Sequence, residues 1–389
     1  MPRAVLDSID MQGSMAVSPR YQVMNEGLTD TVMLLGMDDN LTKGEPRPVN
    51  DLKKMVKEMG RDPESPLLQA LLEVYYAGGR DIWVVAVDDL SGYEPDLDER
   101  DSSYYQAWKD KLVDQFDDLT DLGVEDVVVP LDAPFNSSID FLKPTLEYCL
   151  ERYRRGGDIV QGFIGTRGRI DDEEAETLAQ DGRLDTIRQT AEAGKFLTVM
   201  VGDVSLNLEE MPFGHTASVA PTAAGRSSRL PLDRGLVNRR LPNVNRIAGP
   251  ILKSDTVSKL SQSGLNPVTT TSAGRRGEPF EVVLASDNTL ALEGSDFWSY
   301  QQIRLASNIS KEIKQLGNRR MGNVNFETFR SDVIDYLNFL ENEDTIRDFQ
   351  ADISRSPTNP YRAKVDLLIR PYAGIRQIEI DIEVAPEEE

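Results

Sequence analysis

Between residues 30 and 205 the sequence alternates short runs of branched aliphatic residues with amphipathic stretches. Two of the aliphatic runs, IWVVAV at 82–87 and VVVPL at 127–131, contain no charged residue, which is typical of strands covered on both faces of a sheet. The stretches at 65–79 and 139–157 have helical spacing. Strand and helix alternating in units of this length predict an α/β domain with a largely parallel sheet.

Signals for helix ends support two of these helices. Ser65 stands before Pro66 and Gly78 follows the apolar run, so we expect a helix between them. A shorter helix is expected near 52–59, with Asn50 as the residue that caps its start.

The order of elements changes beyond about residue 285, where two long amphipathic helices precede the last strands. We therefore predict an α/β domain at 25–285 and an α+β domain at 286–375. Residues 1–24 mix Gly, Ser, Pro and Met without a helical period and are expected to form an extended arm. The segment 376–389 is predicted to be a strand that alternates acidic residues with Ile378, Ile380, Ile382 and Val384.

The charge of the chain is unevenly distributed. The formal net charge is −23, which argues against binding to nucleic acid. Residues 88–126 hold fourteen acidic residues against three basic ones, and residues 226–259 hold eight basic residues against two acidic ones. These stretches are either solvated faces or two surfaces that meet between copies of the protein. The second interpretation assigns inter-subunit charge contacts to Arg226, Arg229, Arg239 and Arg240.

Residues for catalysis or metal binding are scarce. The single histidine, His215, lies in a segment expected to be a loop, and no Gly-x-Ser-x-Gly sequence accompanies it. A glycine-rich phosphate loop is absent, and the single cysteine, Cys149, is expected in the core. Acidic pairs such as Asp38/Asp39 and Asp171/Asp172 are most simply solvated carboxylates. We predict no catalytic residue, no metal site and no cofactor.

No apolar run is long enough to cross a membrane, and the first twenty residues lack the apolar stretch of a signal peptide. We therefore expect a soluble protein that does not bind membranes.

Four stretches in a fixed order resemble the contractile tail sheath proteins of phages, a family that includes the sheaths of bacteriocin particles and type VI secretion systems. Each stretch by itself is mostly a pattern of glycine and aliphatic residues, so their order and spacing carry the resemblance. The stretches are TVMLLG followed by LLQALLEVYYAGGRDIWVVAV; VEDVVVPL; TAAGRSSRLPLDRGLVNRRLPNVNRIAG followed by KLSQSGLNPVTT; and the residues from Val324 to Val384.

The resemblance implies a fold and a function. It implies an α/β domain of subtilisin-like architecture without a catalytic triad, an α+β sheath domain nearer the tube, and extended N- and C-terminal arms. The subunit would polymerise helically around a tail tube protein in the virion, meet baseplate and tail terminator proteins, and contract to drive the tube through the host envelope. The C-terminal strand would pair with a sheet of another copy, and the alternative is that it lies at the edge of a sheet in its own domain. Assembly would take place in the host cytoplasm.

The resemblance also places the C-terminal domain against the tube. Six basic residues stand against two acidic ones between 301 and 330, and Lys311, Lys314, Arg319 and Arg320 are the expected tube-attachment residues. Two alternatives stay open at this point: a sheath of a bacteriocin or secretion particle, and an α/β nucleotide-binding enzyme that is supported only by the strand–helix alternation.

Overall fold

The structure is a computed structural model of the 389-residue chain. It describes residues 30–61, 65–87, 126–129, 145, 149, 159–165, 170–182, 184, 193–206, 215–271, 281–291, 298–319, 326–355 and 363–371. The predictions for the arm at 1–24, for Arg320, for residues 376–389 and for most of the acidic stretch 88–126 lie outside the described residues, and they stay predictions.

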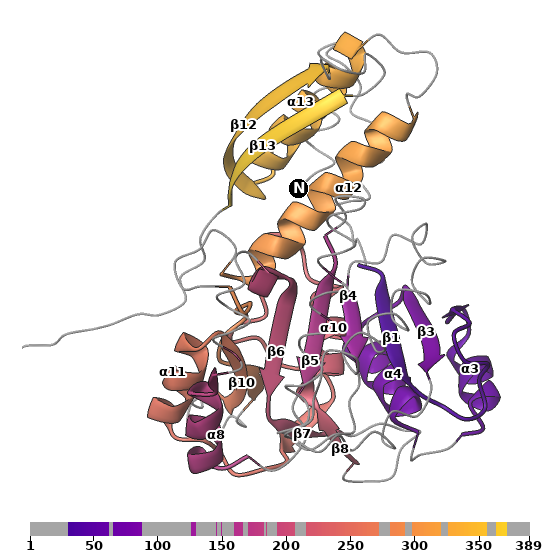
Figure 1. The fold of residues 1–389 in the computed structure, drawn as a ribbon, viewed down its shortest axis with the longest axis vertical. Helices are drawn as coiled ribbons and strands as arrows, with labels where there is room; N and C mark the ends of the chain where they lie inside the picture. The colour runs from indigo at the N-terminus through magenta and orange to yellow at the C-terminus, as the bar shows by residue number, and fades with distance from the viewer. Residues whose placement is uncertain are drawn as a thin grey trace, which may run out of the picture.

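The larger part of the molecule, which we call the body (residues 30–291), is built on an eight-stranded sheet with the order β11-β10-β6-β5-β4-β1-β3-β2 (Figure 1). Its strands are β1 (Val32–Met37), β2 (Arg47–Pro48), β3 (Ile82–Val87), β4 (Asp126–Val129), β5 (Gln161–Gly165), β6 (Leu197–Val201), β10 (Leu265–Thr270) and β11 (Val282–Leu284). The six central strands pair in parallel, and only the short edge strands β2 and β11 pair antiparallel. The expected α/β class with a largely parallel sheet is confirmed.

Helices cover both faces of this sheet. The connection from β1 to β3 contains α3 (Leu52–Glu58) and α4 (Pro66–Ala77), and the connection from β5 to β6 contains α8 (Asp172–Ala179) and the short 3₁₀ turn η3 (Ala193–Phe196). These connections run in opposite directions along the sheet, and because such crossovers are right-handed, α4 and α8 lie on opposite faces. Helix α10 (Val219–Ser227) packs on α4, and α11 (Ser254–Gln262) packs on α8.

The contact between α4 and α10 depends on one glycine. A Cβ atom at Gly225 would lie 2.4 Å from the carbonyl oxygen of Val74, closer than side-chain atoms approach a backbone. The backbones of the two helices are therefore in close contact where the helices cross, and this crossing lies in the core of the body.

The ends of the first helices follow the sequence with one correction. Ser65 accepts a hydrogen bond from the backbone N–H of Leu68 at 3.2 Å and so caps α4, as predicted. Gly78 ends α4 with a φ of 123°, a conformation that favours glycine. The cap of α3 is Asp51 and not Asn50, because the helix begins at Leu52 and the residue immediately before it holds the N-cap position.

A smaller sheet of order β8-β7-β9 lies beside the large one, with the strands β7 (Asp203–Leu206), β8 (His215–Ser218) and β9 (Val244–Ile247). His215, expected in a loop, begins β8 and pairs with Leu206. The loop prediction was wrong here because pairing with β7 supplies a ladder that the local sequence does not indicate.

The remaining elements form the C-terminal unit: α12 (Tyr300–Arg319), α13 (Phe326–Asn342), β12 (Ile346–Arg355) and β13 (Ala363–Pro371). Helix α12 runs out of the body and carries α13 and the β12–β13 hairpin at its far end (Figure 1). The unit has an apolar cluster of its own that includes Ile309, Ile313, Val333 and Tyr336. The exact boundary between the two domains stays a prediction.

Candidate assembly interface

The hairpin of β12 and β13 is a sheet of only two strands. Within the described residues no third strand lies beside either of them, so each strand has one edge whose main-chain groups are outside any ladder. Such an edge is a template on which a further strand can pair. Each strand has nine or ten residues, which is long for an edge strand left uncovered.

One face of the hairpin is apolar and faces α12 and α13. Because residues opposite one another in an antiparallel pair point to the same face, the register defines this inner face. Three opposed pairs form it: Phe349 with Ile369, Ala351 with Leu367, and Ile353 with Val365. Ile353 is buried, whereas the other five are only partly buried against the cluster. The inner face is therefore incompletely covered within the described chain.

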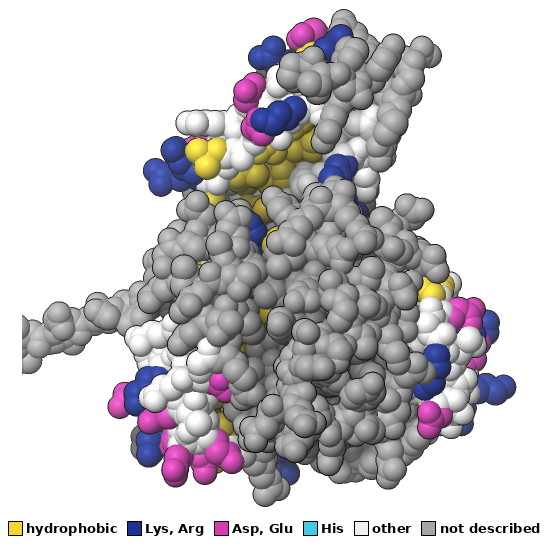
Figure 2. Space-filling view, in the orientation of Figure 1, with side chains coloured by type: hydrophobic (Ala, Val, Ile, Leu, Met, Phe, Trp, Pro, Cys, Tyr) yellow, Lys and Arg dark blue, Asp and Glu magenta, His cyan; other side chains and the backbone are white. Residues whose placement is uncertain are grey.

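Figure 2 shows hydrophobic side chains of the C-terminal unit reaching the surface as a group, with Lys, Arg, Asp and Glu side chains around them. A partly exposed apolar face beside two open strand edges is the arrangement that strand addition needs. The edge supplies hydrogen bonds, and the apolar face accepts every second side chain of the added strand.

The outer face of the hairpin is polar apart from Leu368, which is 50 % exposed. Arg370 donates to the carboxylate of Asp348 at 3.1 Å across the strands. Asp352 stands opposite Asp366, and the hydrogen bond from Lys364 to Asp366 raises the pKa of the Lys364 ammonium. The cross-strand pairs on this solvent face contribute little stability, but they keep the register that places the apolar residues inward.

A buried polar seam joins α12 to the body. Arg304 forms an ion pair with Asp30, and both side chains are almost fully buried, at 4 % and 1 % exposure. Asn308, one turn later on α12, donates to the same carboxylate at 3.3 Å. Arg304 also donates to the carbonyl oxygen of Pro231 at 3.3 Å. The ion pair ties the segment that leads into β1 to the helix that carries the hairpin.

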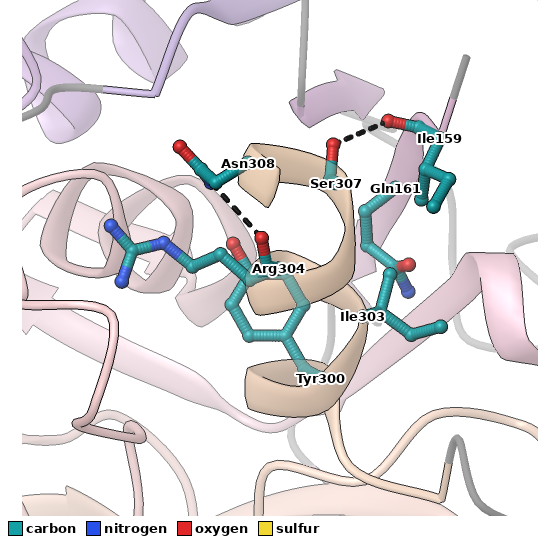
Figure 3. A pocket seen from close by; sticks show the side chains of 7 residues that line it. All are labelled: Ile159, Gln161, Tyr300, Ile303, Arg304, Ser307 and Asn308. Carbon is teal, nitrogen blue, oxygen red and sulfur yellow. Dashed lines mark hydrogen bonds between the residues drawn. The ribbon is translucent and has the colours of Figure 1, made fainter. Parts of the chain in front are cut away.

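Two further contacts extend the seam along α12. Tyr300 donates its hydroxyl to Ser227 at 3.1 Å and packs its ring edge-on against Phe163. Ser307 donates to the carbonyl oxygen of Ile159 at 2.9 Å (Figure 3). The cavity drawn in Figure 3 lies at this seam and has a volume of about 10 Å³, which is room for a single water molecule and not for a nucleotide.

The structure places the predicted basic residues in different surroundings. Arg304, counted with the basic residues of 301–330, is buried in the seam and does not belong to an exposed face. Lys311 is partly buried and Lys314 is exposed on the half of α12 that carries the hairpin, and Arg319 ends the helix. The structure does not test whether these residues contact a tube.

The four arginines predicted for inter-subunit contact lie in the body. Arg226 lies in the last turn of α10, while Arg229, Arg239 and Arg240 follow the helix in the chain. Arg240 lies 3.9 Å from Glu281, so it already has a partner within the subunit. Their role between subunits stays a prediction.

Two acidic pairs that the sequence left as solvated carboxylates have structural partners. Asp171 caps α8 through hydrogen bonds from the N–H groups of Glu173 and Glu174. Asp172 accepts from the backbone N–H of Lys253, and this bond lowers the pKa of the Asp172 carboxyl. Asp38 is buried and accepts from Ser65 at 2.7 Å. The interpretation as solvated carboxylates was therefore wrong for Asp38 and incomplete for Asp171 and Asp172.

Among the described residues, no cluster of three or more His, Cys, Asp or Glu side chains is arranged to hold a metal ion. In the same part of the chain, no helix combines the length and the apolar character that crossing a membrane requires.

Comparison with known proteins identifies the fold. No family model and no curated protein matches the sequence. Solved structures do match over nearly the whole chain. A chain of the contracted sheath complex of an extracellular contractile injection system, PVC, has a TM-score of 0.61 at 12 % identity and covers 91 % of both chains. A chain of the anti-feeding prophage (AFP) baseplate has a TM-score of 0.65 at 10 % identity and covers 92 % of this chain and 94 % of its own.

A crystal structure of a sheath tail protein from Listeria innocua has a TM-score of 0.62 at 12 % identity, over 90 % of this chain and 95 % of its own. Each of the three structures is matched over at least 90 % of this chain and of its own length, so the likeness extends over both the body and the C-terminal unit. The resemblance inferred from the sequence is confirmed at the level of the fold: the chain has the fold of the contractile sheath proteins.

Proposed function

We propose that the protein is the structural subunit of a contractile sheath that polymerises helically around a tail tube. The observation that carries this proposal is the two-stranded hairpin, whose two edges are open within the described residues and whose apolar face is partly exposed, in a chain with the sheath fold. The segment 378–384 has the matching pattern, since its aliphatic side chains alternate with acidic ones. Added to the hairpin of another copy, it would extend the inner face with Ile378, Ile380, Ile382 and Val384.

The contact is heterologous, because a strand leaves one copy and a sheet edge of another copy receives it. Repetition of such a contact produces an open helix, whereas a two-fold interface would close as a dimer. In this proposal the body shares the family's subtilisin-like architecture without a catalytic triad, and the subunit is not an enzyme. Energy for contraction is stored in contacts between subunits when the sheath assembles.

The proposal includes several partners. Lys311, Lys314, Arg319 and Arg320 attach the C-terminal unit to the tube, and Arg226, Arg229, Arg239 and Arg240 contact another copy. The sheath ends meet a baseplate protein, as the likeness to a chain of the AFP baseplate supports, and a tail terminator protein. Neither a cofactor nor nucleic acid takes part.

We propose a phage virion, with the tube driven through the host envelope for genome ejection, as the setting. The second candidate is the sheath of a non-phage contractile injection system, of the bacteriocin or secretion type, and the likeness to the PVC and AFP assemblies favours it. The two settings share the same subunit chemistry. They differ in whether DNA copurifies with particles that contain the protein.

Electron microscopy of the purified full chain tests the proposal. A sheath subunit forms hollow helical tubes above a critical concentration, alone or on added tube protein. A monodisperse monomer at every concentration and salt level, together with hydrolytic or nucleotide-binding activity, would contradict the proposal and support the α/β enzyme.

A further inference from the structure

Three arginines, Arg80, Arg226 and Arg229, lie around the C-terminal end of α4, and the positive charge of Arg239 acts on Arg226. We call these four residues the arginine cluster. A Cβ atom at Gly78 would lie 3.0 Å from Cγ of Arg229, so the stem of this side chain packs over the helix end. Arg80 turns back over the ring of Tyr75, with its guanidinium carbon 4.6 Å from the ring centre. Arg226 follows Gly225, whose carbonyl oxygen faces the same glycine.

None of the four members of the cluster forms an ion pair within the described residues, and the side-chain hydrogen bonds of Arg80 and Arg239 go to backbone carbonyl oxygens. Arg226 is half-buried, and its Nε is shielded from solvent without a hydrogen-bond partner. Burial, and then the positive charge of Arg239, lower the pKa of the Arg226 guanidinium. Packing several arginines together in this way is unfavourable unless an anion joins them.

The last residues of the sequence supply anions of the required kind. Residues 379–389 contain six acidic side chains and no basic one. Pro386 cannot donate a ladder hydrogen bond, so a strand through 378–384 ends before it. The sequence then continues with Glu387, Glu388 and Glu389, three consecutive carboxylates with no apolar residue among them.

The positions of the hairpin and the cluster allow one acceptor subunit to hold both parts of this segment. Ser228, next to Arg229, accepts a hydrogen bond from the N–H of Asp30, which is paired with Arg304 on α12, so the cluster lies near the base of that helix. The hairpin packs on α13, and α13 packs on the second half of α12, roughly 13 Å beyond Arg304 at 1.5 Å per residue. Five extended residues after Val384 reach about 17 Å.

We infer that the arginine cluster binds the carboxylates of Glu387–Glu389 of a second copy, whose strand 378–384 pairs with the hairpin of the same acceptor. This inference rests on the proposed function and names the partner of its basic surface. The acidic stretch 88–126 is the rival occupant. It spreads fourteen carboxylates over thirty-nine residues that also hold three basic residues, whereas the C-terminal segment is already brought to the acceptor by the strand.

Charge reversal on both sides of the contact tests the inference in the full-length chain. Arg226→Glu with Arg229→Glu, or Glu387→Lys with Glu388→Lys, should each raise the critical concentration for tube formation about threefold to thirtyfold at low salt. Combining the four substitutions in one chain restores opposite charges and should return the critical concentration to within about twofold of the parent. Arg234→Glu is the matched control, because Arg234 is exposed on the same segment and lies beside Asp233, 3.8 Å away.

A cross-link provides a readout that does not depend on the stability of the charge variants. Arg229→Cys with Glu388→Cys should form intermolecular disulfides in oxidised tubes, while Arg229→Cys alone should not. If Glu94→Lys, Asp96→Lys and Asp98→Lys together rescue the chain with Arg226→Glu and Arg229→Glu, the rival stretch is the partner and the inference is wrong. If the parent chain forms tubes but neither the charge-reversal rescue nor the cross-link is observed, the inference is wrong and the proposed function still holds. A parent chain that forms no tubes contradicts the proposed function itself.

Discussion

The body and the C-terminal unit differ in how completely each buries its apolar surface. In the body, every residue of β5 and β6 is buried, helices cover both faces of the sheet, and short antiparallel strands end it at both edges. In the C-terminal unit, the inner face of the hairpin is mostly only partly buried and both strand edges are open within the described residues. The body thus buries its own core, whereas in the proposed assembly the C-terminal unit is completed by another chain.

Helix α12 links the two regions with contacts of opposite character. Its first half meets the body through Tyr300, Arg304, Ser307 and Asn308, which all make hydrogen bonds. Its second half packs on α13 through Ile309, Ile313 and Leu316. The polar half fixes the angle at which the helix leaves the body, because hydrogen bonds and an ion pair are directional where apolar contacts are not.

The largest effect is expected from removing Ile375–Glu389. The variant should remain a folded monomer, because the body buries its own core, but it should form no tubes. Sedimentation velocity and circular dichroism of the purified chain measure both properties. Tubes of normal length from the truncated chain would show that the hairpin is completed in another way. Loss of the fold would show that the segment belongs to its own subunit.

The second effect concerns the seam. Asp30→Ala leaves Arg304 buried without its carboxylate, and removing one partner of a buried ion pair costs roughly 3–5 kcal/mol. Replacing both residues, as Asp30→Ala with Arg304→Met, should recover most of this loss, since no unpaired charge is then buried. Urea denaturation compares the three chains. Equal stability of the single and double variants would contradict a coupled pair.

The third effect concerns attachment to the tube. The substitutions that test it lie only in the C-terminal unit, so the body should not be affected. Replacing Lys311, Lys314, Arg319 and Arg320 by Glu should abolish cosedimentation with purified tube while leaving the fold intact. Exposed ion pairs contribute only ~0.2–1 kcal/mol each and are screened by salt, so the parent's own binding should weaken as salt rises. Arg234→Glu is a suitable control, because it reverses an exposed charge in the body and leaves the C-terminal unit unchanged. Tube binding equal to the parent at low and high salt would eliminate this helix as the attachment site.

The sequence predicted the elements whose pattern is decided locally. Continuous aliphatic runs gave β3 and β4, and Ser65 with Gly78 gave the ends of α4. Helix α8 was not predicted, although Asp171 and Glu174 form a capping box that is visible in the sequence. The acidic residues there were interpreted as solvated carboxylates, and the helix signal was overlooked.

Other features depend on contacts between distant parts of the chain. Helix α10 contains Pro221 and Gly225, which are poor helix formers, and it is held by its close crossing with α4. The ion pair of Asp30 and Arg304 joins residues 274 positions apart, so no local pattern indicates it. For the same reason the basic residues of 301–330, which were counted as an exposed basic face, included Arg304, whose side chain is buried in the fold. The sequence analysis named Arg226, Arg229 and Arg239 as contact residues but not Arg80, because Arg80 is distant from them in the sequence and only the fold brings it near.

The smallest effect is a pH dependence within the C-terminal unit. Burial raises the pKa of the Asp335 carboxyl on α13, with a further rise from the charge of Asp332 and an opposing hydrogen bond from Ser331. Because the folded pKa exceeds the unfolded value, the ionised carboxyl is unfavourable in the folded state. Stability is therefore highest below the unfolded pKa, near 4, and falls as pH rises through the folded value.

Asp335→Asn removes this dependence and should raise the free energy of unfolding at pH 7 by no more than about 0.5 kcal/mol, since the carboxyl is only partly buried and solvent still screens it. Near pH 3 the variant and the parent should be equally stable, because the parent carboxyl is then neutral. Glu341→Gln on the same helix is the control, since its side chain is exposed. Urea denaturation between pH 3 and pH 7 measures the difference. Parallel curves for the variant and the parent would mean that Asp335 is as well solvated in the C-terminal unit as in the unfolded chain, and would contradict this prediction.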